Sequence, residues 1–274
     1  MFKAVYIRSY IVAFVLTSVA ACIVFYLNHH LHGDFWEGMQ LGNPGLFREY
    51  CELNKMDFFI RQTVNTYSNL AYFFLGCIIF QLGQFDSQLD NHRNPIASFP
   101  FLSLFFGLCM IYLAVGSAFF HASLTWIGQR IDMNGTYGIC LFMIGICIYR
   151  AITKNDQKKK FKALFVIGIL LSMYGFFYLH LMVKSTILLP VLIGLIIGFT
   201  VYNYLKNKER YTINYAILSI LFMLAAFVLR TLDVQKIGCM PTSIYQGHAL
   251  WHLFTGMSVF FLYMFYRKEN AIEQ

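Results

Sequence analysis

Long apolar stretches recur along the chain, separated by short polar connections. They lie at about 10–27, 64–83, 98–121, 132–149, 161–179, 183–204, 212–230 and 246–267. Each is close to the roughly 20 apolar residues that a helix needs to cross the hydrocarbon core of a bilayer. None shows the sustained period-two alternation of a membrane β-barrel. Because a helix pairs its own backbone groups in lipid, the pattern predicts an all-α, polytopic membrane helix bundle.

The composition agrees with lipid as the main solvent. Of the 274 residues, 58% are hydrophobic and only 12% are charged, and the mean hydropathy is +0.59. A soluble domain carries about 25% charged residues. A chain this poor in charge cannot cover a water-facing surface, so a soluble globular fold is excluded.

The excess of basic residues gives a net charge of +8 and predicts an orientation. With eight helices, 14 of the 21 Lys and Arg fall on the side that holds both termini, and 7 fall on the other side. The densest group spans residues 154–162. Lys and Arg collect in cytoplasmic loops, so both termini are predicted to be cytoplasmic. This rule explains the basicity without a nucleic-acid partner.

The first apolar stretch has two interpretations. Lys3 and Arg8 precede it, and the run from Val19 to Cys22 resembles a lipoprotein cleavage box, so it could be a cleaved signal peptide. Apolar character continues through Leu27, however, and small residues are common in spanning helices. We therefore expect a retained N-terminal helix.

The last stretch opens with two histidines, His248 and His252. The i, i+4 spacing stacks both imidazoles on one helix face, which is how the HExxH motif offers two nitrogens to one zinc ion. Ala249 stands where that motif has its catalytic glutamate, so any base must come from another helix. The alternative is a pair of interfacial histidines at a helix start.

A third histidine, His121, ends the third stretch on the same side of the membrane. Ser117 precedes it by four residues and shares its helix face. Three protein ligands with an open fourth position are typical of a catalytic zinc ion. The alternative for His121 is an interfacial histidine, and the alternative for Ser117 is a small residue that packs between helices.

Carboxylates on the same side suggest two further roles. Asp132 begins the fourth stretch, where it could orient a ligand histidine or accept a proton from water. It could also simply favour the helix N-terminus. Glu49, Glu52 and Asn54 offer the hard oxygen ligands that suit calcium, and the alternative there is a solvated acidic loop. The charge count, made without regard to these residues, assigns all of them to the non-cytoplasmic face.

Several short motifs carry a family resemblance. In chain order they are Cys51-Glu52-x-Asn54, Asn65-Thr66-x-Ser68-Asn69, Gly116-Ser117-x3-His121 with Asp132 eleven residues later, and Gln246-x-His248-Ala249-x-Trp251-His252. Together they resemble the alkaline ceramidases, which belong to a superfamily of seven-helix membrane hydrolases that includes the adiponectin and progestin receptors. The resemblance covers residues 49–267.

The resemblance implies a fold and an activity. It implies a seven-helix hydrolase domain over 49–274, preceded here by an extra hydrophobic helix and a connecting loop over 1–48. It implies hydrolysis of the amide bond of ceramide-like lipids to a fatty acid and a sphingoid base. The partners would then be a lipid amide substrate and the surrounding membrane lipids.

The resemblance also implies specific site residues. Zinc would be held by His121, His248 and His252, with Asp132 as the proton acceptor and Ser117 as a stabiliser of the oxyanion. Calcium would be held by Glu49, Glu52 and Asn54, and a disulfide would join Cys51 to Cys239. Both cysteines fall on the side predicted to be non-cytoplasmic, where oxidising conditions permit the bond.

Four positions depart from the family pattern. Glu49-Tyr50 stands for Asp-Trp, Gln62 replaces a glutamate, and Met133 replaces the glutamate after the catalytic aspartate. The lost carboxylate at Gln62 weakens the calcium prediction, and Met133 leaves the substrate open.

Two other functions fit the same residues. One is a related lipid hydrolase or remodelling enzyme that acts on another acyl amide or ester, which a substrate panel would distinguish. The other is a non-enzymatic seven-helix receptor with structural zinc, which would bind the metal without turnover. A transporter is disfavoured, because the paired broken helices typical of that class are not evident.

Overall fold

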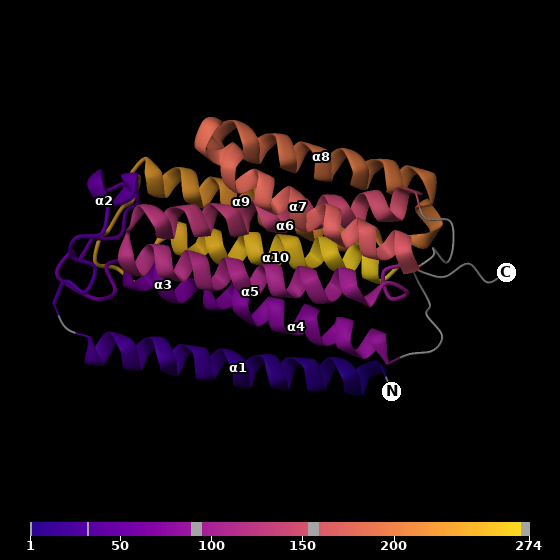
Figure 1. Cartoon of the computed structure of the whole chain (residues 1–274), viewed down its shortest axis with the longest axis horizontal. Coiled ribbons are helices and arrows are strands. Elements are labelled where there is room, and N and C mark those ends of the chain that lie inside the picture. The colour runs from indigo at the N-terminus through magenta and orange to yellow at the C-terminus, as the bar shows by residue number, and fades with distance from the viewer. Residues whose placement is uncertain (1, 32, 89–94, 153–158, 270–274) are drawn as a thin grey trace.

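The computed structural model describes residues 2–31, 33–88, 95–152 and 159–269, and it confirms the all-α bundle (Figure 1). Within these residues, eight helical spans are long and apolar enough to cross a membrane, and the protein is a multi-pass membrane protein. The elements are α1 Phe2–His30, α2 Asn43–Leu46, α3 Thr63–Ser68, α4 Leu70–Ser87, α5 Pro100–Ser123, α6 Trp126–Ile152, α7 Lys159–Met182, α8 Ser185–Lys206, η1 Lys208–Arg210, α9 Ile213–Val234 and α10 Gly247–Arg267.

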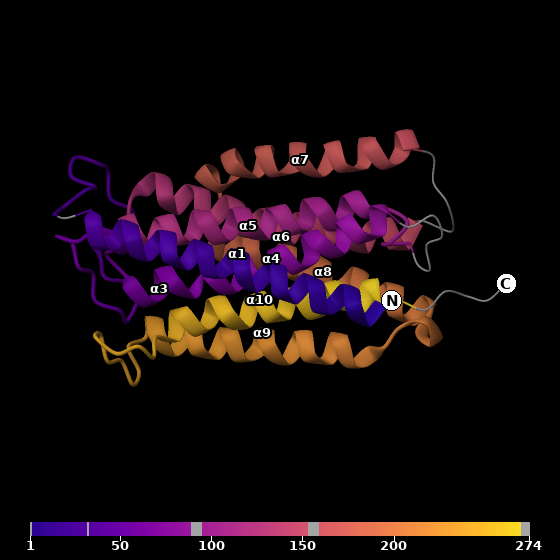
Figure 2. The same cartoon turned by 90° about the horizontal axis from the view of Figure 1, so that it is seen from below.

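Burial separates inner helices from outer ones. In the most apolar part of the α3–α4 span and of α5, α6 and α10, at least half of the residues are buried, against 6–17% in α1, α7, α8 and α9. Across the bundle, α1 lies at one edge and α8 at the opposite edge (Figure 1), and α7 lies at an edge when the bundle is seen from below (Figure 2). From below, α9 runs beside α10 (Figure 2). The four inner elements therefore form the protein core, and the outer helices expose their apolar side chains.

The inner helices α4 and α5 approach each other closely through glycine. A Cβ atom added at Gly107 would lie 2.6 Å from the backbone nitrogen of Phe80, and one added at Gly76 would lie 2.9 Å from the Gly107 carbonyl oxygen. Small residues are enriched where membrane helices touch, because packing rather than the hydrophobic effect drives their association. This contact holds α5 firmly in the core.

The helix that carries Asp132 begins earlier than the apolar pattern predicted. It starts at Trp126 rather than near residue 132, so Asp132 lies in its second turn. The Thr125 hydroxyl accepts a hydrogen bond from the backbone N–H of Gly128 at 3.2 Å. A threonine in this place satisfies one of the unpaired donors at a helix start. The cap therefore allows polar Gln129 and Arg130 to lie inside the helix.

Charged side chains anchor the far end of α10. Arg267 forms a buried ion pair with Asp86 of α4, and Arg150 of α6 contacts both carboxylate oxygens of Glu269 at 2.5 Å. Arg210 also lies 3.1 Å from Glu269. Buried charges are tolerated only when they are paired, so these contacts fix the end of α10 relative to its neighbours.

The first apolar stretch forms α1, which packs along α4. The Gln81 amide of α4 donates to the Ser9 carbonyl oxygen at 3.3 Å. The division of the chain into residues 1–48 and 49–274 stays a prediction.

Candidate metal centre

The structure brings together the three histidines that the sequence singled out. His121 lies in the last turn of α5, while His248 and His252 lie in the first turns of α10. Each offers one nitrogen, and these nitrogens all lie within 4.8 Å of one another. All three side chains are buried. They lie at the end of the bundle that also holds α2 and α3 (Figure 1).

The spacing of the nitrogens fits a single metal ion. Nε2 of His248 and Nε2 of His121 are 3.2 Å apart. A tetrahedral ion with bonds of about 2.0–2.1 Å holds its ligand nitrogens roughly 3.3 Å apart. The His121–His248 pair already has this separation, and the nitrogen of His252 lies within 4.8 Å of both.

Hydrogen bonds set the ring tautomers of two of these histidines. The Ser68 hydroxyl donates to the Asn65 carbonyl oxygen at 2.8 Å, so it is an acceptor for Nδ1 of His252 at 2.7 Å. The Oε1 atom of Gln62 can only accept, so Nδ1 of His121 donates to it at 2.7 Å. In both rings the proton is on Nδ1, and the Nε2 lone pair is free for a metal ion.

An aromatic ring supports the third histidine. Tyr50 stacks on His248 with ring centroids 3.8 Å apart and planes 21° from parallel. Nδ1 of His248 has no hydrogen-bond partner among the described residues. Burial raises the pKa of Tyr50 well above its usual value, so the ring stays neutral. The stacking therefore supports the imidazole although its Nδ1 atom has no hydrogen-bond partner there.

Ser117 and Asp132 line the same cavity as His248 and His252, and this cavity has a volume of about 280 Å³. The hydroxyl of Ser117, one turn before His121, is buried beside the Asp132 carboxylate. The wall of one cavity thus holds imidazole nitrogens, a carboxylate and a hydroxyl. These are the groups needed to activate water and to stabilise a developing negative charge.

An apolar cavity of about 250 Å³ adjoins the site. Both cavities are lined by Tyr72, Leu113, Thr136, Leu189, Phe227 and Trp251. The apolar cavity extends between α8 and α9, where Ile197 and Leu224 are more than half exposed. The site therefore continues from polar groups into an apolar space near the outer surface of the bundle.

Sequence reasoning missed several of these neighbours. Arg230 lines the polar cavity with its guanidinium 5.4 Å from the Trp251 ring. A charge at the end of an apolar span on the histidine side was a usable signal. Ser68 was noted only within a family motif, and Tyr50 and Gln62 only as departures. Nothing in their spacing predicts contact with the histidines.

The three residues predicted to bind calcium have separate partners. The Glu52 carboxylate accepts the backbone N–H groups of Val64 and Asn65 at 2.7 and 2.8 Å. Burial raises the pKa of Glu52, and these two hydrogen bonds oppose the rise. Glu49 lies 3.9 Å from Arg230. The calcium site stays a prediction.

The remaining member of that set, Asn54, bridges two neighbours. Its amide nitrogen donates to the Pro44 carbonyl oxygen, and its amide oxygen accepts from Gln62. A calcium ion at this oxygen would compete with the Gln62 amide or share the oxygen with it.

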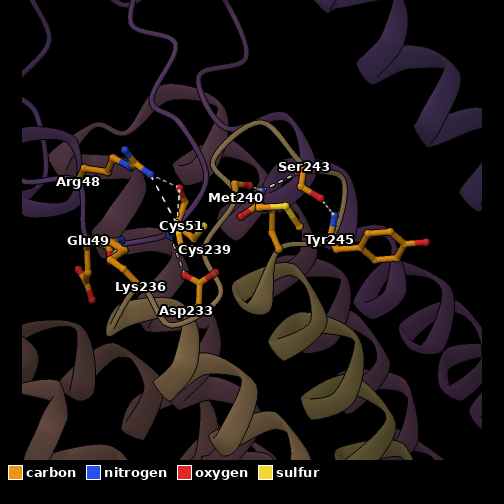
Figure 3. Close-up of a disulfide and its surroundings, with 10 residues drawn as sticks. Arg48, Glu49, Cys51, Asp233, Lys236, Cys239, Met240, Ser243 and Tyr245 are labelled. Carbon is orange, nitrogen blue, oxygen red and sulfur yellow. Dashed lines mark hydrogen bonds between the residues drawn. A yellow bond between two sulfur atoms is a disulfide. The ribbon is translucent and has the colours of Figure 1, made fainter.

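A disulfide joins Cys51 to Cys239, as the resemblance implies (Figure 3). It connects the loop before α3 with the loop before α10, across 188 residues of chain. The backbone N–H of Cys51 donates to Asp233 at 2.9 Å, and Lys236 donates to the Glu49 carbonyl oxygen at 2.6 Å. These contacts hold the segment with Tyr50 against the end of α9 and the start of α10.

Removing the disulfide should lower stability and activity together. The double substitution Cys51→Ser and Cys239→Ser is expected to cost about 2–5 kcal/mol, because the bond closes a long loop. Activity should fall because Tyr50 loses its fixed position on His248. Melting in detergent micelles, followed alongside turnover, measures both effects. Cys22→Ser, at an exposed free cysteine on α1, is the control, and equal melting of the two variants would refute the prediction.

Comparison with known proteins agrees with this geometry. The Ceramidase family profile matches residues 48–274. The chain is also 28% identical over 263 aligned positions, covering 80% of this chain and 84% of the relative, to the Dictyostelium discoideum protein named "Putative alkaline ceramidase dcd3A". The profile spans the loop, α5, α6 and α10 that supply the site residues. The chain therefore belongs to the Ceramidase family and is a hydrolase that acts on the ceramide amide bond.

Proposed function

We propose that the protein is a zinc-dependent intramembrane amidohydrolase that converts ceramide-like lipids to a fatty acid and a sphingoid base. The observation that carries the proposal is the convergence of three buried imidazoles beside a cavity that also holds Asp132 and Ser117. Zinc is favoured because three neutral imidazole ligands with an open position are typical of its catalytic sites.

Each residue has a distinct part in the proposed reaction. His121, His248 and His252 would hold the zinc ion, which would supply Lewis-acid chemistry at the water and the amide carbonyl. Asp132 accepts the proton of the attacking water and delivers it to the leaving amine nitrogen. The Ser117 hydroxyl donates a hydrogen bond to the carbonyl oxygen as negative charge develops there. Water adds across the C–N bond, which gives one carboxylic acid and one amine.

The adjoining apolar cavity suits a hydrocarbon chain. Its lining is largely aliphatic and aromatic, and it continues the polar cavity. We propose that a lipid chain enters from the bilayer between α8 and α9, with its amide beside the histidines. A hydrocarbon chain there gains the packing contacts that an empty apolar space would lack.

The disposition of the site across the membrane is also proposed. The distribution of Lys and Arg favours cytoplasmic termini, and a disulfide favours an oxidising compartment for Cys51 and Cys239. Both observations support a metal centre at the non-cytoplasmic face. In this proposal, residues 1–48 form an appended helix and loop outside the seven-helix catalytic domain.

Metal removal tests the function directly. Treating the purified protein with a strong zinc chelator should abolish ceramide hydrolysis, and one equivalent of Zn²⁺ should restore it. Metal analysis by mass spectrometry should find one zinc ion per chain. Undiminished hydrolysis by metal-free protein would overturn the proposal.

Two further arms of the same assay separate the alternatives. Faster turnover of another acyl amide, or of a lipid ester, would identify a different substrate. Stoichiometric zinc with no turnover of any lipid would indicate a receptor. Adding Ca²⁺ to chelated, zinc-restored protein tests the predicted calcium site.

A further inference from the structure

A continuous line of hydrogen bonds runs from a backbone carbonyl to one of the metal-ligating histidines. The Asn54 amide nitrogen donates to the Pro44 carbonyl oxygen at 3.1 Å, and the Gln62 amide nitrogen donates to the Asn54 amide oxygen at 2.7 Å. Nδ1 of His121 then donates to the Gln62 amide oxygen at 2.7 Å. Gln62 and His121 are fully buried, so water does not compete for the hydrogen bond between them.

This line has a fixed direction. A backbone carbonyl can only accept, so Asn54 must turn its NH₂ group to Pro44 and its oxygen to Gln62. Gln62 must in turn present its NH₂ group to Asn54 and its oxygen to His121. Asn65 reinforces this orientation, because its amide nitrogen donates to the same Gln62 oxygen at 3.1 Å.

Backbone contacts hold Gln62 in place beside the helix that carries His121. The backbone N–H of Gln62 donates to the His121 carbonyl oxygen at 3.1 Å, and that of Arg61 donates to the Ala122 carbonyl oxygen at 3.0 Å. The Arg61 guanidinium donates to the Ser123 carbonyl oxygen at 2.6 Å. Carbonyls in the last turn of a helix have no partner within the helix, so this segment satisfies the end of α5 while it delivers Gln62.

We propose that Gln62 is a positioning residue that fixes the tautomer and the ring orientation of His121. The Pro44 carbonyl, which can only accept, sets the donor-to-acceptor direction of the whole line. With the proton held on Nδ1, Nε2 of His121 faces Nε2 of His248 as a free lone pair. The inference rests on the proposed function in one respect, which is that a metal ion occupies the histidine cluster. An outer partner of a metal-ligating histidine contributes to both metal affinity and geometry.

Metal binding by substituted proteins tests this role. Gln62→Met keeps the length of the side chain but removes the acceptor, and it should weaken Zn²⁺ binding by roughly 10–100-fold, the usual cost of losing an outer partner. Gln62→Glu restores an acceptor for His121 and should keep Zn²⁺ affinity within a few-fold of the wild type. Gln81→Met changes a glutamine on α4 that bonds only to the Ser9 carbonyl among the described residues, and it should bind as the wild type does.

The measurement is competition with a chromophoric zinc chelator, paired with the visible absorption of the Co²⁺-loaded protein. Gln62→Met should shift the Co²⁺ bands, whereas Gln62→Glu and Gln81→Met should retain them. Asn54→Leu should weaken Zn²⁺ binding by less than Gln62→Met, because it removes only the partner that orients the Gln62 amide and leaves the acceptor for His121 in place.

The outcomes separate this inference from the proposed function. Wild-type protein that binds no metal would overturn both. Wild-type protein that binds metal, with Gln62→Met binding equally well, would overturn the positioning role alone. Equal loss in Gln62→Met and Gln62→Glu would overturn it too, since that result indicates packing rather than hydrogen bonding.

Discussion

Replacing His248 with alanine should abolish ceramide hydrolysis while leaving the protein inserted in the membrane. The substitution removes one of the three nitrogens that converge on the buried site. Loss of an outer partner typically costs about 10–100-fold in metal affinity or activity, so loss of a direct ligand should exceed that range. Turnover and zinc content should fall together, measured by product release and by mass spectrometry.

His30→Ala is the matched control for this experiment. His30 is exposed at the end of α1, where Nδ1 contacts the Tyr26 carbonyl oxygen at 3.0 Å. This variant should keep both zinc and activity. Wild-type turnover by His248→Ala, with the protein correctly folded, would eliminate the metal mechanism.

Replacing Asp132 with asparagine should separate chemistry from metal binding. The side chain keeps its size and its place in the cavity beside Ser117, but an amide cannot accept the proton of the attacking water. Turnover should fall by about 10²–10⁴-fold, the usual contribution of a general base. Zinc content should stay at the wild-type level, because the three histidines are untouched.

Asp57→Asn serves as the control, since Asp57 is exposed in the loop before α3. It should retain full turnover. If Asp132→Asn hydrolyses ceramide at the wild-type rate, another group accepts the proton. If it loses zinc as well, Asp132 supports a ligand instead.

The bundle could be predicted from sequence because lipid imposes a simple rule. Spanning helices need long apolar stretches, and all eight stretches became helices. The start of α6 was wrong by six residues, because Thr125 caps a turn that contains polar Gln129 and Arg130. The pattern of apolar positions does not show where a side chain caps a helix.

The candidate site could be predicted only in part, for a related reason. The spacing of His248 and His252 fixes a shared helix face, and the topology brings the end of α5 alongside. The groups that orient the rings come from an irregular loop and a short helix. Contacts such as those of Gln62 and Tyr50 depend on the path of that loop, which the disulfide and Asp233 determine. No periodic pattern encodes such a path.

The ion pairs at the far end of α10 limit how the enzyme can move. With Arg267 held by Asp86 and Glu269 held by Arg150, this helix cannot slide or rotate without separating buried charges. Its opposite end is bound by the loop closed through Cys239. The helix that carries His248 and His252 is therefore tied to its neighbours at both ends. On the proposed route between α8 and α9, a lipid chain therefore reaches two histidines on a helix that is held at both ends.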